Sequence, residues 1–273
     1  MPARHTPYVV IEKALGQTPL AALEAWRARN PAHAALPATY AGRLDPMAEG
    51  KLLVLLGEEC KRQEAYRGLD KQYEIEVVLG LETDTGDALG MPSEGSSALP
   101  SAAAIRKVVR SLEGTVTLPY PAYSSKTVAG KPLFQYALEG TLGTIEIPTH
   151  TETLYRIRHH GTTRIPKAEL EEWIADILSR APRAEEASKE LGRDFRQDDI
   201  RAAWTALFRS MQRQDFMLLR LCVTAGSGAY MRTLAERIGA LLGMPGMALS
   251  IRRTKIGTYR TLLGKGFWTK EYR

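Results

Sequence analysis

The 273-residue sequence has little cysteine and no long apolar run. Its two cysteines, Cys60 and Cys222, lie too far apart for a CxxC metal knuckle, and they cannot supply the disulfide framework of a small secreted protein. No segment approaches the ~18 consecutive apolar residues that a membrane-spanning helix needs, and the N-terminal residues lack the apolar stretch of a signal peptide. We therefore expect a cytoplasmic protein without a membrane partner.

Several catalytic and cofactor motifs are missing as well. The sequence contains no GxxxxGK[ST] phosphate loop, no HExxH and no GxSxG, and Gly226 and Gly228 lack the third glycine of a dinucleotide fingerprint. His159 and His160 have no ligand partner at metal spacing, so we interpret them as surface residues. We expect neither a metal nor an organic cofactor.

Composition and charge are those of a soluble globular protein with a basic C-terminal segment. The chain is 44% hydrophobic and 25% charged, and 37 Lys and Arg against 31 Asp and Glu give a net charge of +6. The whole excess lies after residue 250, in Arg252, Arg253, Lys255, Arg260, Lys265, Lys270 and Arg273, against Glu271. Such a segment suits contact with a polyanion such as nucleic acid, and it also suits a solvated tail.

Helix and strand patterns alternate along the chain without a repeat of fixed period. Thr18 precedes a helix over residues 19–30, and Ser101 caps another. Apolar and polar residues alternate over residues 73–79, which predicts a half-buried strand. Further strands are predicted over 145–158 and 216–224, and a Gly-, Ser- and Pro-rich loop over 89–100.

Residues 159–215 differ from the segments on either side. Pro166 opens one amphipathic helix, Asp199 precedes a second, and a charged stretch from Arg180 to Arg196 joins them. We expect a helical insertion, 159–215, between two strands of one sheet, whether as a separate domain or as a lid.

Residues 40–50 contain the motif that points most clearly to a catalytic role. Gly42 and Gly50 bracket an Asp-Pro pair at Asp45 in a tight loop, and an apolar run follows. Asp before Pro often only shapes a turn, so Asp45 suits a structural role as well as a catalytic one.

Five blocks in this order resemble the pseudouridine synthases, and the later four select the TruB-type tRNA branch. They are Gly42-Arg43-Leu44-Asp45 with Glu49-Gly50; Lys71-Gln72-Tyr73 with Thr83-Asp84-Thr85-Gly86-Asp87; Pro121-Ala122-Tyr123-Ser124 with Gly130-Lys131-Pro132-Leu133; Gly228-Ala229-Tyr230-Met231-Arg232-Thr233-Leu234; and Ile251-Arg252-Arg253-Thr254-Lys255-Ile256-Gly257. Weaker matches at Lys13, Gly16 and Thr18 cover the N-terminal part of the sequence.

The resemblance implies an α+β pseudouridine synthase fold, with a mixed, mainly antiparallel sheet flanked by helices and a central RNA-binding cleft. The catalytic domain would comprise residues 1–158 and 216–273. The sequence stops soon after Gly257, where many relatives continue into an RNA-binding PUA domain, so we expect none here. A monomer is the default expectation.

Four positions depart from the TruB-type pattern. Tyr40 stands where a histidine is usual, Arg43 replaces a small residue, Ala14 replaces a proline, and Lys126 comes one position before the usual lysine. The Arg-Leu-Asp sequence is closer to the ribosomal and RluA-like branches of the superfamily.

The catalytic residues implied by the resemblance are Asp45, Tyr73 and Arg232. A carboxylate is anionic at neutral pH and needs no activating base, so Asp45 can attack the ribose or abstract its proton. Arg232 would hold both carboxylate oxygens in its planar fork, although an arginine after a strand can also be a surface residue. Tyr73 would stack on the unstacked uracil and place its hydroxyl for proton removal from C5, whereas its pattern alone also suits a core tyrosine.

The same resemblance implies a set of substrate-binding residues. Tyr40, Arg43, Tyr230 and Ile251 would line the uridine pocket, and Arg252, Arg253 and Lys255 would contact phosphates. In the insertion, Arg193, Arg196, Arg201, Arg209 and Arg213 suit either an RNA grip or a solvated face.

The implied function is isomerisation of a uridine in the tRNA T-loop, with the T-stem-loop as partner. A second reading keeps the chemistry and takes ribosomal or other RNA as substrate, because of Arg43. A third is a tRNA-folding chaperone with weak or lost catalysis.

Overall fold

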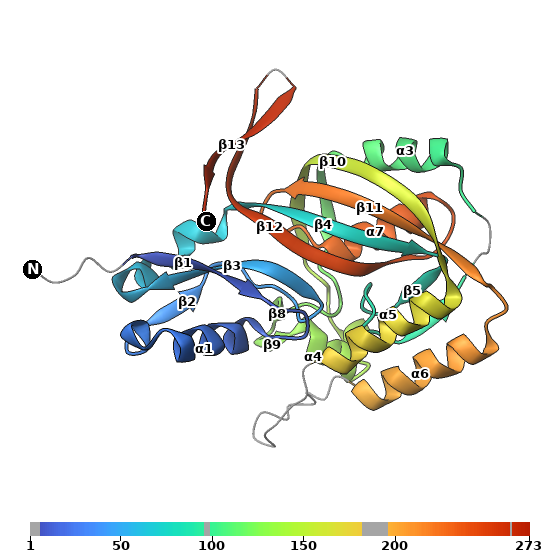
Figure 1. Ribbon diagram of the computed structural model, residues 1–273, viewed down its shortest axis with the longest axis horizontal. Helices are drawn as coiled ribbons and strands as arrows, with labels where there is room; N and C mark the ends of the chain where they lie inside the picture. Colours follow the sequence, from blue (N-terminus) through green and yellow to red (C-terminus); the bar gives the residue numbers. More distant parts are fainter. Residues whose placement is uncertain (1–5, 96–98, 182–195, 263) are drawn as a thin grey trace, which may run out of the picture.

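The computed structural model describes residues 6–95, 99–181, 196–262 and 264–273 (Figure 1). Within them, one nine-stranded sheet runs in the order β1-β3-β12-β4-β11-β10-β7, with β2 paired to β3 and β13 to β12. Its strands are β1 (Tyr8–Lys13), β2 (Ala38–Tyr40), β3 (Ala48–Leu56), β4 (Asp70–Leu79), β7 (Gly114–Pro119), β10 (Thr149–Pro166), β11 (Asp215–Ala225), β12 (Gly246–Leu262) and β13 (Lys265–Glu271). All pairs in this sheet are antiparallel except β3 with β12, so the predicted mixed, mainly antiparallel α+β fold is confirmed.

Helices cover both faces of this sheet. They are α1 (Pro19–Arg29), α2 (Gln63–Arg67), α3 (Ala102–Ser111), α4 (Leu133–Leu138), α5 (Lys167–Arg180), α6 (Gln197–Ser210) and α7 (Met231–Leu241), with short 3-10 turns η1 (Pro31–His33), η2 (Gly57–Arg62) and η3 (Leu142–Thr144). Helices α3 and α7 pack on one face of β4 and β11, and α5 and α6 pack on the other. None of the described helices is long and apolar enough to cross a membrane.

The predicted helix starts are confirmed by their caps. The Thr18 hydroxyl accepts a hydrogen bond from the Ala21 N–H at 3.1 Å, and the Ser101 hydroxyl accepts one from the Ala104 N–H at 3.2 Å. Each bond satisfies a backbone donor that has no partner inside the helix. Between these two helices, the predicted loop over 89–100 contains a short strand, β6 (Pro92–Glu94), which pairs with β5 (Leu81–Thr83); a further short pair is β8 (Thr127–Val128) with β9 (Lys131–Pro132).

Two expectations about the middle of the chain need correction. The insertion begins at Lys167 rather than at residue 159, because β10 extends through Pro166 and pairs with β11 along its length. Strand β4 is half-buried over Ile75 and its exposed neighbour Glu74, but not at its end, since Val77 and Val78 point to opposite faces and both are fully buried. The reason is that α5 and α6 pack their apolar faces on the side of the sheet that the alternating pattern assigned to solvent. Helices α5 and α6 therefore contribute to the core on this side of the sheet.

The C-terminal end of the sheet extends beyond the body of the molecule. The last part of β12, from Gly257, forms a hairpin with β13 that projects beyond the rest of the sheet (Figure 1). Pairing of Arg260 with Phe267 and of Leu262 with Lys265 places these four side chains on one face of the hairpin, and all four are exposed.

Candidate active site

Asp45 lies in the loop between β2 and β3, and neighbouring backbone holds this loop. The Gly16 N–H donates to the Pro46 carbonyl at 2.9 Å, and the Ala48 N–H donates to the Asp45 carbonyl at 3.0 Å. Gly50 has a φ of +100°, and a Cβ there would lie 2.4 Å from the Arg253 carbonyl oxygen, so only glycine lets β3 approach β12 so closely. Gly50 is thus required because the backbone of β12 packs against β3 at this position.

Arg253 supports this loop from beneath and is not placed to contact phosphate. Its side chain is 1% exposed, and its guanidinium donates to the carbonyls of Lys51 at 2.7 Å, Arg43 at 3.3 Å and Gly42 at 3.4 Å. Burial lowers the pKa of Arg253, and the neighbouring Tyr73 hydroxyl acts in the opposite direction. Its position does not support the predicted phosphate contact, because its charge is used inside the protein.

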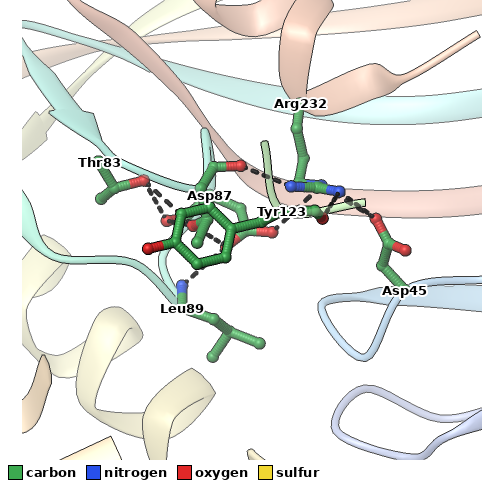
Figure 2. A network of polar contacts seen from close by, with 7 residues as sticks. Asp45, Thr83, Asp87, Leu89, Tyr123 and Arg232 are labelled. Carbon is green, nitrogen blue, oxygen red and sulfur yellow. Dashed lines mark hydrogen bonds and ion pairs between the residues drawn. The ribbon is translucent and has the colours of Figure 1, made fainter. Parts of the chain in front are cut away.

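The predicted contact between Arg232 and Asp45 is present, with one difference (Figure 2). Arg232 lies in the first turn of helix α7 and is 4% exposed, whereas the Asp45 side chain is about half exposed. Both Nε and Nη2 of Arg232 lie 2.9 Å from the same oxygen, Oδ2. The fork therefore fixes one oxygen and not two, and Oδ1 points away from the guanidinium.

Asp87 is a second carboxylate on the same arginine, to which no role was assigned from the sequence. It is 4% exposed, its Oδ2 lies 3.6 Å from Arg232 Nε, and its Oδ1 accepts from the Thr85 hydroxyl at 2.8 Å and the Leu89 N–H at 2.9 Å. Burial raises the pKa of Asp87, and Arg232 and these hydrogen bonds oppose the rise. Burial likewise opposes the charge of Arg232, but Asp45 and Asp87 outweigh it and raise the Arg232 pKa. The only signal in the sequence was the Thr-Asp-Thr-Gly-Asp segment itself.

A cleft of about 830 Å³ opens in front of Asp45. Tyr40, Arg43, Tyr73, Tyr230, Ile251, Arg232 and the buried Arg253 line it among others, so the structure gathers these predicted residues around one space. Tyr73 both lines the cleft and packs against the core, so its position is compatible with both interpretations. The Tyr230 N–H donates at 3.3 Å to Glu152, a fully buried carboxylate that sequence reasoning missed and that also accepts from Arg237.

Arg252 and Lys255 do not line this cleft. The Arg252 guanidinium lies 3.0 Å from Glu49 and 3.4 Å from Glu12, and the Lys255 ammonium lies 3.7 Å from Glu271. Their predicted phosphate contacts are therefore not supported by their positions, since both charges are already paired away from the cleft.

The insertion's arginines are also mostly engaged within the protein. Arg196 contacts Asp84, Arg201 contacts Asp198 and the Leu178 carbonyl, and Arg213 lies near Glu94, whereas Arg209 is exposed. Arg193 lies outside the described residues.

Two buried lysines flank the loop that carries Asp45. Lys13 is 1% exposed and donates to the carbonyls of Ala14 and Gln17; Lys71 is 5% exposed and donates to those of Arg67 and Leu69. Burial lowers the pKa of each to about 8; Asp45 opposes this shift at Lys13, whereas Arg253 adds to it at Lys71. No group of three or more His, Cys, Asp or Glu side chains within the described ranges could hold a metal ion.

Comparison with known proteins decides the family. The model of the TruB family pseudouridylate synthase N-terminal domain matches residues 33–171, which is about half of the chain. The chain belongs to the TruB family. This TruB-family chain is 30% identical to tRNA pseudouridine synthase B of Aromatoleum aromaticum, over 92% of its own length and 63% of the relative's. Identity to the protein of the same name from Nitrosospira multiformis is also 30%, covering 92% and 64% of the two chains.

The TruB-family chain thus spans less than two thirds of the length of these curated relatives. Among solved structures, it is similar to a chain in the crystal structure of a Cbf5-Nop10-Gar1 complex, with a TM-score of 0.53 and 16% identity. That match covers 92% of the present chain and 48% of the other, and it shows a shared fold.

Proposed function

We propose that this chain isomerises a uridine in the T-loop of tRNA to pseudouridine. Membership of the TruB family and the names of its relatives support the reaction and the tRNA substrate. The observation that carries the proposal is the carboxylate of Asp45, half exposed in a large cleft, with one oxygen fixed by a buried arginine and the other pointing away from it.

The reaction breaks the N-glycosidic bond, turns the uracil and rejoins it to the ribose through C5. Asp45 Oδ1 serves either form of the first step, attack on the ribose or removal of its proton, because Arg232 occupies only Oδ2. The guanidinium also holds the carboxylate in position before substrate arrives. After C5 has bonded to the ribose, the proton that leaves C5 would pass to the Tyr73 oxygen as the hydroxyl gives its own proton to solvent, and N1 takes up a proton in its place. The atoms balance without a redox partner, since product and substrate are isomers.

RNA binding requires cations that are free to meet phosphate. Arg43 and Lys126 line the cleft, and no described acidic side chain forms an ion pair with either; Lys126 lies 5.1 Å from the centre of the Tyr120 ring. Arg260 and Lys265 share the exposed face of the β12–β13 hairpin with Leu262 and Phe267. Our candidates for tRNA-binding cations are Arg43, Lys126, Arg260 and Lys265, in place of Arg252, Arg253 and Lys255.

Release of tritium from tRNA labelled at uracil C5 tests the proposal. Wild-type protein should release tritium, and Asp45→Asn should release none. Glu58→Gln, which alters an exposed carboxylate paired with Lys61 on the surface, is the matched control and should behave as wild type. Activity that survives Asp45→Asn contradicts the mechanism, and tRNA binding without release favours the chaperone reading.

The target is tested in cells that lack the gene, by mapping pseudouridines in all RNA. One missing T-loop pseudouridine is the expected result. Loss confined to ribosomal RNA contradicts the choice of substrate.

A further inference from the structure

The helical insertion reaches the active site at several residues. Leu178, Gln197 and Ile200 line a pocket with Asp45 and Arg232, and Arg196 makes a polar contact beside it. Arg196 precedes α6, and its Nη2 lies 2.8 Å from Asp84 Oδ2. The same Asp84 oxygen accepts the Tyr123 hydroxyl at 2.9 Å, and the guanidinium carbon of Arg196 lies 5.1 Å from the centre of the Tyr123 ring. Three segments that are remote in sequence therefore meet at one carboxylate.

These contacts hold the two carbonyl groups that position the catalytic arginine. Arg232 Nη1 donates to the Thr85 carbonyl at 2.7 Å, and Nη2 donates to the Tyr123 carbonyl at 3.2 Å. Asp84 is the residue directly before Thr85, and its side chain binds Tyr123. A single carboxylate thus ties together both carbonyl-bearing segments, and Arg196 neutralises it.

The surrounding contacts keep Asp84 and the insertion in place. The other Asp84 oxygen accepts from the Met91 N–H at 2.8 Å, and burial, together with Asp84 as hydrogen-bond acceptor, raises the pKa of Tyr123 to about 12. On α6, the Trp204 indole N–H donates to the Ala88 carbonyl at 3.1 Å. The insertion is therefore anchored in the same loop that carries Asp84 and Asp87.

We propose that Arg196 is a positioning residue, which holds Asp84 and Tyr123 so that the Thr85 and Tyr123 carbonyls keep the Arg232 guanidinium on Asp45. This inference rests on the proposed function for its effect on rate. Arg196 does not line the cleft, so its loss should slow the chemical step and leave RNA affinity unchanged.

Single-turnover tritium release with saturating enzyme measures the effect on chemistry. Arg196→Ala should lower the rate constant about tenfold with an unchanged dissociation constant for tRNA, and Arg196→Lys should restore part of it. Asp84→Asn should cause a similar loss, and the double variant should be no slower than either single one, because both act through one contact. Arg209→Ala, which removes an exposed arginine from the same helix, is the control and should leave the rate constant unchanged.

Exchange of the Arg232 Nε proton with solvent, followed by NMR, reports on the guanidinium without any reaction. Assignment by Arg232→Lys identifies the signal, and Arg196→Ala or Arg196→Lys should speed its exchange. If wild-type protein releases no tritium, the proposed function fails, and the inference is decided by this exchange rate alone. An active wild type whose Arg196 variants keep both the rate constant and the slow exchange overturns the inference.

Discussion

Four buried cations and two exposed cations of this molecule lie in different surroundings. Lys13, Lys71, Arg232 and Arg253 are each at most 5% exposed and surround the loop that carries Asp45. Each donates to backbone carbonyls, and Arg232 also contacts Asp45. Arg43 and Lys126, by contrast, border an open cleft without an acidic partner among the described residues. The buried set fixes geometry, whereas the exposed set is free to meet phosphate.

The largest difference should follow from Arg232→Lys. A lysine keeps the charge but cannot place two donors on Asp45 Oδ2 and one on each of two carbonyls, so the tritium-release rate constant should fall by about 10²–10³-fold. The dissociation constant for tRNA should change little. A rate within threefold of wild type would show that the charge is sufficient and that the placement of the donors is dispensable here.

Loss of Arg253 should mainly affect stability. Arg253→Met keeps the volume but leaves the Gly42, Arg43 and Lys51 carbonyls without their donor, which should cost about 2–4 kcal/mol of unfolding free energy. Urea unfolding measures this cost. The neighbouring exposed Arg252, replaced by Met, should cost no more than ~0.5 kcal/mol, and equal losses at both positions would erase the distinction between buried and exposed cations.

Lys71 should give stability a distinctive pH dependence. Its pKa in the folded protein is about 8, below the ordinary 10.5 of an unfolded chain, so the unfolded state binds more protons between these values. The cost of burying the charge is fully present below pH 8, and the free energy of unfolding should rise from pH 8 toward 10.5. Lys71→Met should lose this contribution, and the exposed Lys61→Met should keep it; parallel curves for wild type and Lys71→Met would contradict the buried charge.

The smallest effects are expected in the cleft. Arg43→Ala and Lys126→Ala should each weaken tRNA binding severalfold and reduce the slope of log affinity against log salt by about one. Arg252→Ala should leave that slope unchanged, because Glu12 and Glu49 already pair its charge. A reduced slope for Arg252→Ala alone would instead support the contact with nucleic acid that was first expected for the C-terminal basic segment.

Adjacent residues show where prediction from sequence stops. Local patterns correctly gave the helix starts at Thr18 and Ser101 and the strands around Tyr73 and over 216–224, because caps and alternation depend on near neighbours. Arg252 and Arg253 look alike in sequence, yet strand alternation places one at the surface and the other in the interior. The burial of Val78 on the second face of β4 and the contact of Asp87 with Arg232 depend on segments more than 80 residues away, which no local pattern encodes.

The predicted end of the strand at residue 158 was wrong for a different reason, since β10 continues to Pro166. Residues 159–164, His-His-Gly-Thr-Thr-Arg, contain no apolar alternation, so nothing marks them as a strand. Their backbone nevertheless pairs with β11, across an irregularity between His159 and Gly161. Hydrogen bonds to a partner strand decided the structure where side-chain pattern gave no signal.

The parallel pairing of β3 with β12 sets an order of events during synthesis. Residues 48–50 pair with residues 251–253, and Arg253 then supplies the donors that hold the Gly42 and Arg43 carbonyls. A contact across some two hundred residues cannot form until the later strand has left the ribosome. The loop that carries Asp45, although made early, therefore acquires its final shape among the last parts of the chain, and a nascent protein released too soon has a carboxylate but no finished site around it.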